Sequence, residues 1–365
     1  MTSTRDALEA NQISSTAAIG QLDVVVGGQF GSEAKGHVTA QVAVRRISQG
    51  YPVTAVRVAG PNAGHSAIGC IDGIKWSLRQ IPVAAVVSTD VQLVIGAGSE
   101  VDESVLTSEV EALDAAGYQV SGRLVIDDQA TVLDPTHKHR EEENGYNQRF
   151  GSTAKGIGAA RIARLEREAA TWGGGADTAL TLNARLALNE AVVIEGTQGY
   201  GLGLHAGFYP FCTSSDCRAI DFLAMAGIAP WRRDLGLDVW VVARTFPIRV
   251  AGNSGPLENE LTWDEMIEFT GGYITEPELT TVTKKPRRIG EWDSGLVKMA
   301  MIANGAPSKH THLVISFLDY IDPTMADGGE LTERASEFLQ AVEKDCGVQV
   351  DGYTTGPAHI TWRHK

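Results

Sequence analysis

Apolar residues gather in seven short runs along the chain, and each run is nearly continuous in hydrophobicity. Strands that are covered on both faces have this pattern, whereas half-exposed strands alternate apolar and polar positions. The sequence therefore predicts seven buried strands. They are expected at 23–27, 53–60, 91–98, 123–127, 191–196, 239–245 and 312–319.

Helical patterns lie between these runs. Residues 34–48 (AKGHVTAQVAVRRIS) and 104–117 (SVLTSEVEALDAAG) are two examples, and Gly117 ends the second. Strands and helices in repeated alternation predict an α/β fold, with a mainly parallel central sheet in a single large domain. We expect this catalytic domain over residues 21–365, preceded by a peripheral N-terminal extension over residues 1–20.

Glycine-rich and polar segments follow the predicted strands. In a parallel sheet, ligands bind beyond the carboxyl ends of the strands. These segments are therefore expected to meet at one edge of the sheet and to form a binding site there.

The composition is typical of a soluble globular protein, with 43% hydrophobic and 21% charged residues. The net charge of −14 argues against a general nucleic-acid binder but is compatible with a local nucleotide site. We find no run of about 18 apolar residues, and no apolar core of a signal peptide near the start. We therefore expect a cytoplasmic protein that binds neither nucleic acid nor membrane.

The loop after the first predicted strand has the composition of a phosphate-binding turn. In "GGQFGSEAKGH", glycines allow backbone amides to approach an anion, and the start of the following helix offers unpaired N–H groups. Lys35 adds a positive charge. The loop differs from the Walker pattern, because Lys35 is followed by Gly36 and not by Ser or Thr.

A second loop brings further polar groups to the same edge. "AGPNAGHS" follows the second strand and contains Asn62, Gly64, His65 and Ser66. A histidine at the end of a parallel strand is well placed to donate a proton or a hydrogen bond to a phosphoryl oxygen.

Basic residues are clustered in one segment of this acidic chain. Lys284, Lys285, Arg287 and Arg288 lie within five positions of one another. Such a cluster is either a solvated loop or an anion site, and the residue pattern alone leaves both open.

The two loops resemble those of the adenylosuccinate synthetase family, which usually shows "GDEGKGK" after its first strand and "NAGHT" after its second. The counterparts here are "GSEAKGH" and "NAGHS". Further similar segments follow in the family's order over nearly the whole chain. They are "GSTAKGIG" at 151–158, "IEGTQG" at 194–199, "YPFCTSS" at 209–215, "TTVTKKPRRIG" at 280–290, "FLD" at 317–319 and "TTGP" at 354–357.

The resemblance implies a P-loop-NTPase-like fold and a carbon–nitrogen ligase. The family moves the γ-phosphoryl group of a nucleoside triphosphate onto the 6-oxygen of a purine nucleotide, and the amine of aspartate then displaces that phosphate. Such a reaction depends on positioning and positive electrostatics. By resemblance, Mg²⁺ is the cofactor, held by Ser32 and the carbonyl of Gly64.

The resemblance also assigns the site residues. The catalytic residues are Ser32, Lys35 and His65. The triphosphate site comprises Gly31, Glu33, Ala34, Lys35, Gly36, Gly64, His65, Ser66, Phe317, Asp319, Thr355, Gly356 and Pro357. The nucleotide monophosphate site comprises Ser32, Asn62, Ser152, Thr153, Arg164, Gln198, Thr213 and Val250. The aspartate site comprises Thr281, Val282, Thr283, Lys285, Arg287 and Arg288.

The family also implies a homodimer, because an arginine from the partner subunit usually reaches the monophosphate. The nearest matches to that arginine are Arg164 and Arg161.

Ser32 departs from the family, whose loop aspartate takes a proton from the purine. A serine hydroxyl is a poor base. One interpretation is therefore a nucleotide-binding pseudoenzyme. Another is an ordinary adenylosuccinate synthetase acting on IMP and GTP, in which Glu33 or a water replaces the base. The third is a changed substrate, since guanylate carries a 2-amino group that an aspartate would crowd and a serine can accept.

The third interpretation agrees with one branch of the family, the phage-encoded synthetases of the diaminopurine (2-aminoadenine) DNA pathway. They act on dGMP, and this sequence is similar to them in its serine and in "GSTAKGIG". Phe317 replaces a family lysine two residues before Asp319, where it either stacks on the base of ATP or dATP or belongs to the core. The sequence thus predicts a ligase that makes N6-succino-2-amino-2′-deoxyadenylate from dGMP and L-aspartate.

Overall fold

The computed structural model of the chain describes residues 20–232, 235–279 and 285–363. Nine strands form its central sheet, and all neighbours in it are parallel except the last pair at one edge. From that edge the strands are β16 (His359–Trp362), β15 (Val350–Thr355), β14 (Thr311–Ser316), β10 (Leu235–Arg244), β1 (Gly20–Gly27), β9 (Ala191–Glu195), β2 (Val53–Arg57), β5 (Gln92–Ile95) and β7 (Leu124–Ile126).

All seven predicted strands belong to this sheet, so the prediction of an α/β fold with a mainly parallel sheet is confirmed. The two strands that the sequence analysis missed, β15 and β16, lie at one edge. Their sequences, VDGYTT and HITW, are not continuously apolar. β16 is also the antiparallel strand, and its side chains alternate between exposed and half-buried positions.

Successive side chains of the central strands enter two different cores. Val24 and Val26 of β1 face one core, and Val25 between them faces the other. Because both faces are covered, a continuous apolar run is stable as a strand here. Helices α2 (Lys35–Ser48) and α3 (Glu103–Ala115) contribute to the core on the Val25 side. The opposite core includes residues of α7 (Thr178–Ala187), α8 (Ala219–Met225), α10 (Ser294–Ala303) and α11 (Glu333–Cys346).

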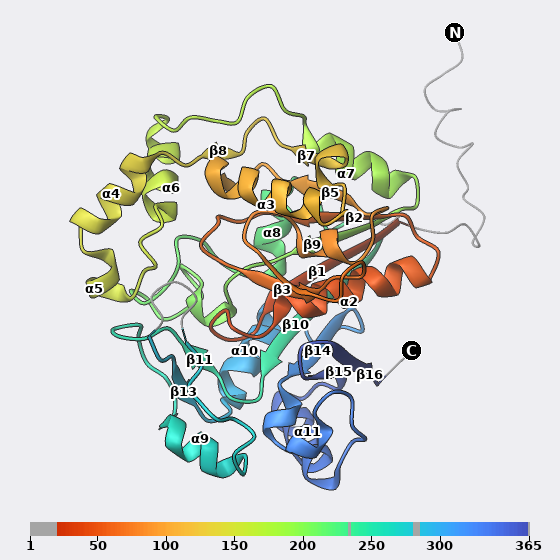
Figure 1. Cartoon of the computed structure of the whole chain (residues 1–365), viewed down its shortest axis with the longest axis vertical. Coiled ribbons are helices and arrows are strands. Elements are labelled where there is room, and N and C mark those ends of the chain that lie inside the picture. Colours follow the sequence, from red (N-terminus) through yellow and green to blue (C-terminus); the bar gives the residue numbers. More distant parts are fainter. Residues whose placement is uncertain (1–19, 233–234, 280–284, 364–365) are drawn as a thin grey trace.

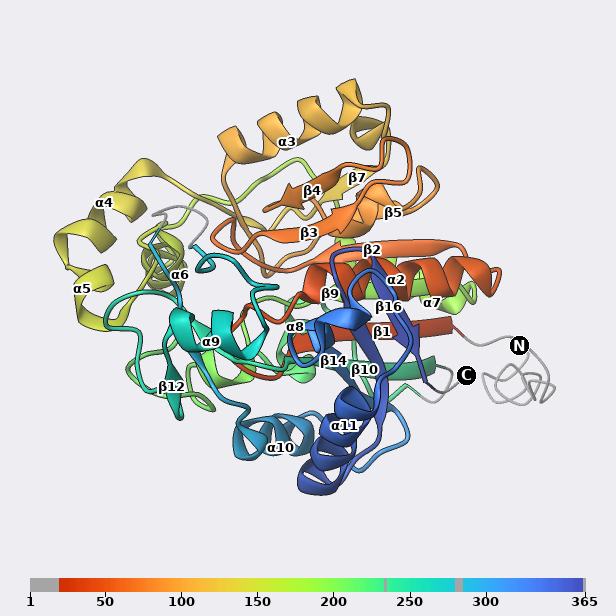
Figure 2. The same ribbon diagram turned by 60° about the horizontal axis from the view of Figure 1, so that its bottom comes forward.

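Short elements gather beyond the carboxyl ends of the central strands. Figure 2 shows helices α4 (Pro135–Glu143), α5 (Tyr146–Phe150), α6 (Ile157–Glu166) and α9 (Trp263–Phe269) together at the left of the molecule, on the side toward which β1 runs. A small sheet of β11 (Ile248–Arg249), β13 (Arg288–Gly290) and β12 (Glu260–Leu261) lies beneath α4 and α5 in Figure 1. Of these elements, α4, α5, α6 and β11 contribute residues to the lining of the site, together with the loops at the strand ends.

The remaining short elements complete the chain. Two pairs of short strands are β3 (His65–Ile68) with β4 (Lys75–Leu78), and β6 (Glu100–Val101) with β8 (Thr131–Val132). Single 3₁₀ turns are η1 (Val83–Val86), η2 (Val120–Gly122), η3 (Tyr200–Leu202), η4 (Leu318–Tyr320) and η5 (Pro323–Met325).

Helix α2 begins without the aspartate cap that α3, α7 and α10 have. The side chains of Asp102, Asp177 and Asp293 accept hydrogen bonds from the first amides of α3, α7 and α10. At α2, the residue before the helix is Ala34 in a left-handed conformation (φ 60°), and among the described residues none caps it with a side chain. The first amides of α2 are therefore available to a ligand.

Within the described residues, no helix has the length and apolar character needed to span a membrane.

Candidate active site

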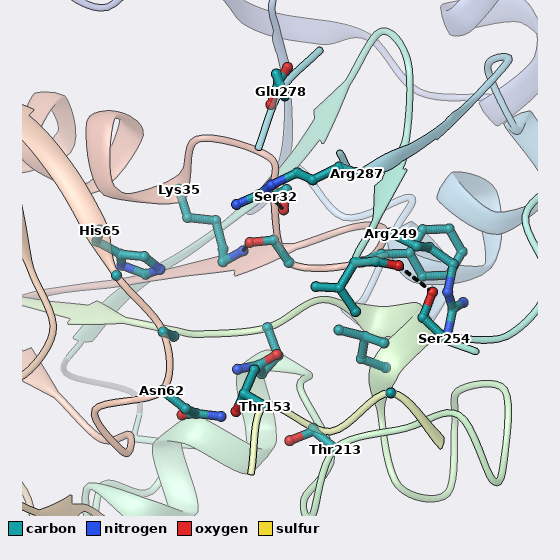
Figure 3. Close-up of a pocket in the computed structure, with 18 of the residues that line it drawn as sticks. Ser32, Lys35, Asn62, His65, Thr153, Thr213, Arg249, Ser254, Glu278 and Arg287 are labelled. Carbon is teal, nitrogen blue, oxygen red and sulfur yellow. Dashed lines mark hydrogen bonds between the residues drawn. The ribbon is translucent and has the colours of Figure 1, made fainter. Parts of the chain in front are cut away.

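A cavity of ≈ 1370 Å³ lies where the loops after β1, β2, β9, β10 and β14 meet. The glycine-rich and polar segments that follow the predicted strands are expected to meet at one edge of the sheet, and the cavity lies at that edge. Figure 3 shows Asn62, Thr153 and Thr213 on one side of the cavity and Arg287 and Glu278 on the opposite side. Ser32, Lys35 and His65 lie between these two sides in the same view.

The loop between β1 and α2 (residues 28–34, the phosphate loop), which is predicted to bind phosphate, is held by its own carboxylate. The backbone amides of Gln29 and Gly31 donate to Glu33 Oε1 at 3.0 and 2.7 Å. Lys35 Nζ donates to Glu33 Oε2 at 2.7 Å and to the carbonyl of Gly31 at 3.2 Å. Glu33 is fully buried and outside the cavity lining, whereas Lys35 and Gly31 line it. Glu33 therefore shapes the loop and positions Lys35 from behind.

His65 belongs to a buried group of three charged or titratable side chains. Its Nδ1 lies 2.6 Å from Glu195 Oε1, and Arg57 Nη1 donates to the same oxygen. The second oxygen, Oε2, accepts from the amide of Val83 at 2.7 Å. Arg57 also donates to the carbonyl of Ala63 at 2.6 Å, which fixes the loop that carries His65.

This arrangement determines which ring nitrogen of His65 carries a proton. Burial alone would raise the pKa of Glu195, but Arg57 and His65 lower it, so Glu195 is ionised and only accepts hydrogen bonds. Nδ1 of His65 must then be the donor. Burial, with the charges of Arg57 and Lys35, lowers the pKa of His65, although Glu195 acts in the opposite direction. A neutral His65 therefore keeps a lone pair on Nε2.

The close approach between α2 and His65 requires the glycine that follows Lys35. A Cβ atom built on Gly36 would lie 2.7 Å from the Cβ of His65 and 2.7 Å from the amide of Ser66. Such distances are too short for any side chain. Gly36 therefore lets the start of the helix and the His65 loop meet, and both line the cavity.

Two arginines hold Ser32. Arg287 Nη1 donates to the hydroxyl of Ser32, and Arg244 Nη1 donates to its carbonyl at 3.2 Å. Arg244 also pairs with Glu278 at 2.7 Å. Burial would raise the pKa of Glu278, but Arg244 and then Arg287 lower it, so this carboxylate is charged. Ser32 thus lies beside two cations and close to one anion.

Aromatic and acidic side chains form the part of the cavity around η4. The guanidinium carbon of Arg244 lies 4.1 Å from the centre of the Phe317 ring. Phe317 is half-buried and lines the cavity, so it is not an interior core residue. Asp319 is almost completely buried, and its Oδ2 accepts a hydrogen bond from the hydroxyl of Tyr273 at 2.9 Å.

The side of the cavity opposite Arg287 is built from hydroxyl and amide groups. Ser152, Thr153, Gln198 and Thr213 line it together with Asn62. Val250 also lines the cavity, and its carbonyl accepts from the hydroxyl of Ser254 at 2.6 Å, as the dashed line in Figure 3 shows.

Several other predicted residues are described but lie outside the cavity lining. Arg164 Nη2 donates to Gln129 Oε1 at 3.0 Å. Arg161 does line the cavity, and it is paired with Glu100 at 2.6 Å. The residues outside the lining are Glu33, Arg164, Thr355, Lys285 and Arg288.

For two of these residues, Arg288 and Thr355, the local structure explains why they lie outside the lining. Arg288 pairs with Glu260 at 2.6 Å, on the neighbouring strand β12. Thr354, one residue before Thr355, lines the cavity in its place. Thr281, Val282 and Thr283 lie outside the described residues, so their placement stays a prediction.

The sequence analysis missed several charged residues of the site. Arg57, Glu195 and Arg244 each interrupt an apolar strand at its carboxyl end. A charge within a buried strand is rare unless it has a partner, and this is the signal that was available. The signal is not specific, because Asp23 also interrupts β1 but pairs with Arg46, which is outside the cavity lining.

Ser32 and Gly64 both line the cavity and offer neutral oxygen atoms that fit Mg²⁺ in combination with substrate phosphates. Among the described residues, no group of three or more His, Cys, Asp or Glu side chains could hold a metal ion. A cation here would therefore depend on oxygen atoms of the bound nucleotides.

Comparison with known proteins agrees with this site. The family model for adenylosuccinate synthetase matches residues 24–174 and 174–327. The adenylosuccinate synthetase of Thermococcus sibiricus is 35% identical over 345 residues, covering 92% of this chain and 95% of the relative. That of Archaeoglobus fulgidus is 35% identical over 348 residues, with the same coverage.

Two solved structures share the fold. One is the cyanophage S-2L succinoaminodeoxyadenylate synthetase (PurZ) bound to dGMP and dATP as an energy donor. It is 26% identical, with a TM-score of 0.77 and coverage of 94% of this chain and 95% of that one. The other is the fully ligated adenylosuccinate synthetase from Plasmodium falciparum, 19% identical with a TM-score of 0.77 and coverage of 95% and 100%.

The order of the glycine-rich loops around one cavity, the buried histidine and the matches over nearly the full chain lead to one conclusion. The chain belongs to the adenylosuccinate synthetase family and is a carbon–nitrogen ligase.

Proposed function

We propose that this enzyme condenses L-aspartate with dGMP, using ATP or dATP, to give N6-succino-2-amino-2′-deoxyadenylate. In the first step a bond forms between the guanine O6 and the γ-phosphorus, the bond from that phosphorus to the diphosphate breaks, and the N1 proton passes to a base, which we propose to be Nε2 of His65. In the second step the aspartate amine bonds to C6, phosphate leaves with O6, and the nitrogen loses its extra protons. ATP thus gives ADP and phosphate.

The observation that carries the proposal is the serine at position 32. Its side chain lines the cavity beside Lys35. A serine is smaller than an aspartate and uncharged, so it leaves room for a 2-amino group and can accept a hydrogen bond from it. The similarity to the cyanophage enzyme bound to dGMP and dATP supports the same substrate class.

The residues around Ser32 suit phosphoryl transfer. Lys35 and the first amides of α2 would stabilise the charge on the transferred group. Mg²⁺, held by the carbonyl of Gly64 and by phosphate oxygens, would neutralise phosphate charge when bound, which leaves the hydroxyl of Ser32 to the 2-amino group. The neutral His65 offers Nε2 as a proton acceptor, and the ionised Glu195 would stabilise the imidazolium that then forms.

Among the predicted aspartate ligands that the structure describes, Arg287 is the best placed. It lines the cavity, while Lys285 and Arg288 do not. Its guanidinium is bonded to the hydroxyl of Ser32, so binding of a substrate carboxylate would compete with this contact. We therefore expect aspartate binding and the contacts of Ser32 to be coupled.

A homodimer would complete the monophosphate site. Arg164 does not line the cavity of its own chain. If Arg164 contacts the monophosphate, it must therefore do so in the cavity of a second copy. Sedimentation of the protein, and the Michaelis constant for dGMP in Arg164→Ala, would test this.

An ordinary adenylosuccinate synthetase is the second candidate, because curated synthetases are about 35% identical to this chain. In that case IMP would replace dGMP, and a water would replace the missing base. Glu33 is less suited to that task, since its carboxylate is bound to two amides and to Lys35.

One assay separates the candidates. The protein is mixed with Mg²⁺, aspartate, ATP or GTP, and either dGMP or IMP, and phosphate release is followed. We expect turnover with dGMP. Turnover with IMP alone would overturn the proposal in favour of the ordinary synthetase, and no turnover with either would indicate a pseudoenzyme.

A further inference from the structure

Asp319 is a buried carboxylate, and only one of its two oxygens has a hydrogen-bond partner among the described residues. Its Oδ2 accepts a hydrogen bond from Tyr273, whereas no described residue gives Oδ1 a hydrogen-bond partner. Both side chains line the cavity. Leaving a buried acceptor unpaired is unfavourable, so Oδ1 is expected to receive a donor from a bound ligand.

Tyr273 keeps its proton and remains a donor to Asp319. Partial burial and the hydrogen bond to Asp319 raise the pKa of Tyr273 to about 12. Its ring also lies edge-on to Tyr320, with 6.4 Å between the ring centres. The hydroxyl is thus held on Oδ2, where it competes with any ligand donor.

The neighbouring side chains fit a purine base in this place. Phe317 and Pro357 line the same cavity and offer apolar surface. Arg244 stacks on the Phe317 ring at 4.1 Å, and Tyr320 contacts that ring edge-on at 5.1 Å. Phe317 is therefore fixed in orientation, as a surface that a base packs against must be.

The two purine bases place different donors before a carboxylate. Guanine presents two adjacent donors, N1–H and the 2-amino group, which match the two oxygens of a free carboxylate. Adenine presents one exocyclic amine beside an acceptor nitrogen. With the Tyr273 hydroxyl on Oδ2, Oδ1 is the oxygen of Asp319 that no described residue bonds, and it matches the single donor of adenine.

We infer that Tyr273 determines the base of the triphosphate, because its hydroxyl competes with the ligand for Oδ2 of Asp319 and so favours adenine, which brings one donor, over guanine, which brings two. The inference rests on the proposed function only in placing the base of the phosphoryl donor against Asp319. It adds Tyr273 as a specificity-determining residue of the ligase.

The test compares kcat/KM for GTP with kcat/KM for ATP, as phosphoryl donors, in the wild type and in Tyr273→Phe. Removing the hydroxyl frees Oδ2, so we expect kcat/KM for GTP relative to ATP to rise by about tenfold or more. Tyr118→Phe is the matched control, because its hydroxyl donates to Asp72 and neither residue lines the cavity, so it should leave the ratio unchanged. An unchanged ratio in Tyr273→Phe would overturn the inference.

ITP makes the test sharper, because it differs from GTP only in lacking the 2-amino group. The wild type should use ITP at least as well as GTP, since the second donor of guanine must compete with the Tyr273 hydroxyl for Oδ2. Tyr273→Phe should prefer GTP over ITP. If the ratio of kcat/KM for ITP to kcat/KM for GTP were the same in both proteins, competition between the Tyr273 hydroxyl and the guanine 2-amino group for Asp319 would be excluded.

Binding measurements separate this inference from the proposed function. The affinities of the β,γ-imido analogues of ATP, GTP and ITP can be measured by calorimetry without aspartate or monophosphate. We expect the wild type to bind the ITP analogue at least as tightly as the GTP analogue, and Tyr273→Phe to bind the GTP analogue more tightly. If the wild type turned over IMP and not dGMP, the proposed function would fail, but the effect of Tyr273→Phe on these affinities would still be decisive.

Discussion

The hydroxyl of Ser32 accepts a hydrogen bond from Arg287, a residue 255 positions later in the chain. This contact joins the phosphate loop to the basic segment across the cavity. It also means that the position at which the chain departs from its family touches a predicted ligand of aspartate. A substitution at Ser32 should therefore affect both the purine and the amino-acid substrate.

Ser32→Asp tests the role of serine in substrate choice. A carboxylate there would crowd a 2-amino group and pair with Arg287, so we expect kcat/KM for dGMP to fall by about tenfold or more. Some use of IMP is expected to appear. The measurement is phosphate release with each monophosphate at saturating ATP and Mg²⁺.

Ser32→Ala is the control for that substitution, because it removes the hydroxyl without adding bulk. It should retain more dGMP turnover than Ser32→Asp. If Ser32→Asp used dGMP as well as the wild type does, the account based on the space around the 2-amino group would be wrong.

Glu195→Gln should destabilise the protein. It would leave the buried guanidinium of Arg57 without its counter-ion, and breaking a buried pair in this way costs about 3–5 kcal/mol. Denaturant unfolding would measure the loss. Glu260→Gln, which removes the partner of Arg288 in a much more exposed pair, should cost about 1 kcal/mol or less. If both variants lost a similar free energy of unfolding, burial of the Arg57–Glu195 pair would not explain the cost of breaking it.

Ala34→Gly should stabilise the protein slightly. Ala34 adopts a left-handed conformation, which is unfavourable for a residue with a Cβ atom and favourable for glycine. The family loop usually has glycine at this position. We expect a gain of about 1 kcal/mol in the free energy of unfolding, measured in denaturant. A loss of stability would show that the Ala34 methyl group makes contacts that outweigh the strain.

His312 predicts a pH dependence that is separate from the active site. It lies outside the cavity lining, between Asp238 at 3.3 Å and Asp351 at 3.2 Å. Burial alone would lower its pKa, but the two carboxylates raise the pKa of His312 to about 9. Because this is above the unfolded value of about 6.5, the stabilisation is complete below pH 6.5 and is lost as the pH rises through 9.

The corresponding experiment compares the wild type with His312→Gln in denaturant. By linkage, the charged histidine contributes about 3 kcal/mol at pH 6. The difference in free energy of unfolding between the two proteins should shrink by about this amount at pH 10. A difference independent of pH would show that His312 acts by packing on Trp240, whose ring is stacked on it at 4.2 Å.

The sequence was most informative where both faces of a strand are buried. All seven continuous apolar runs became strands of one sheet. Six of them are mostly buried, as such runs predict, and the exception is the edge strand β7, whose residues are half-buried. The predicted end of the last run was too late. β14 stops at Ser316, since Phe317 turns into a left-handed conformation (φ 60°) that brings Asp319 to the cavity.

The site was less completely predictable, because pairing between distant side chains leaves no local pattern. Glu195 and Arg57 come from strands that are not consecutive in the sequence but are neighbours in the sheet. The sequence contained Glu195 within a motif of the family, yet nothing in it indicated that this carboxylate would fix a proton on His65. The same holds for Tyr273, whose contact with Asp319 depends on a loop conformation.

The carboxylate of Glu33 gives the phosphate loop a further property. Since Glu33 already holds two loop amides and Lys35, the loop is ordered before any nucleotide arrives. Ordering a loop on binding would weaken affinity through lost conformational entropy, and a preorganised loop avoids that cost. The free energy of the phosphate contacts thus remains available to distinguish the transition state from the bound substrates.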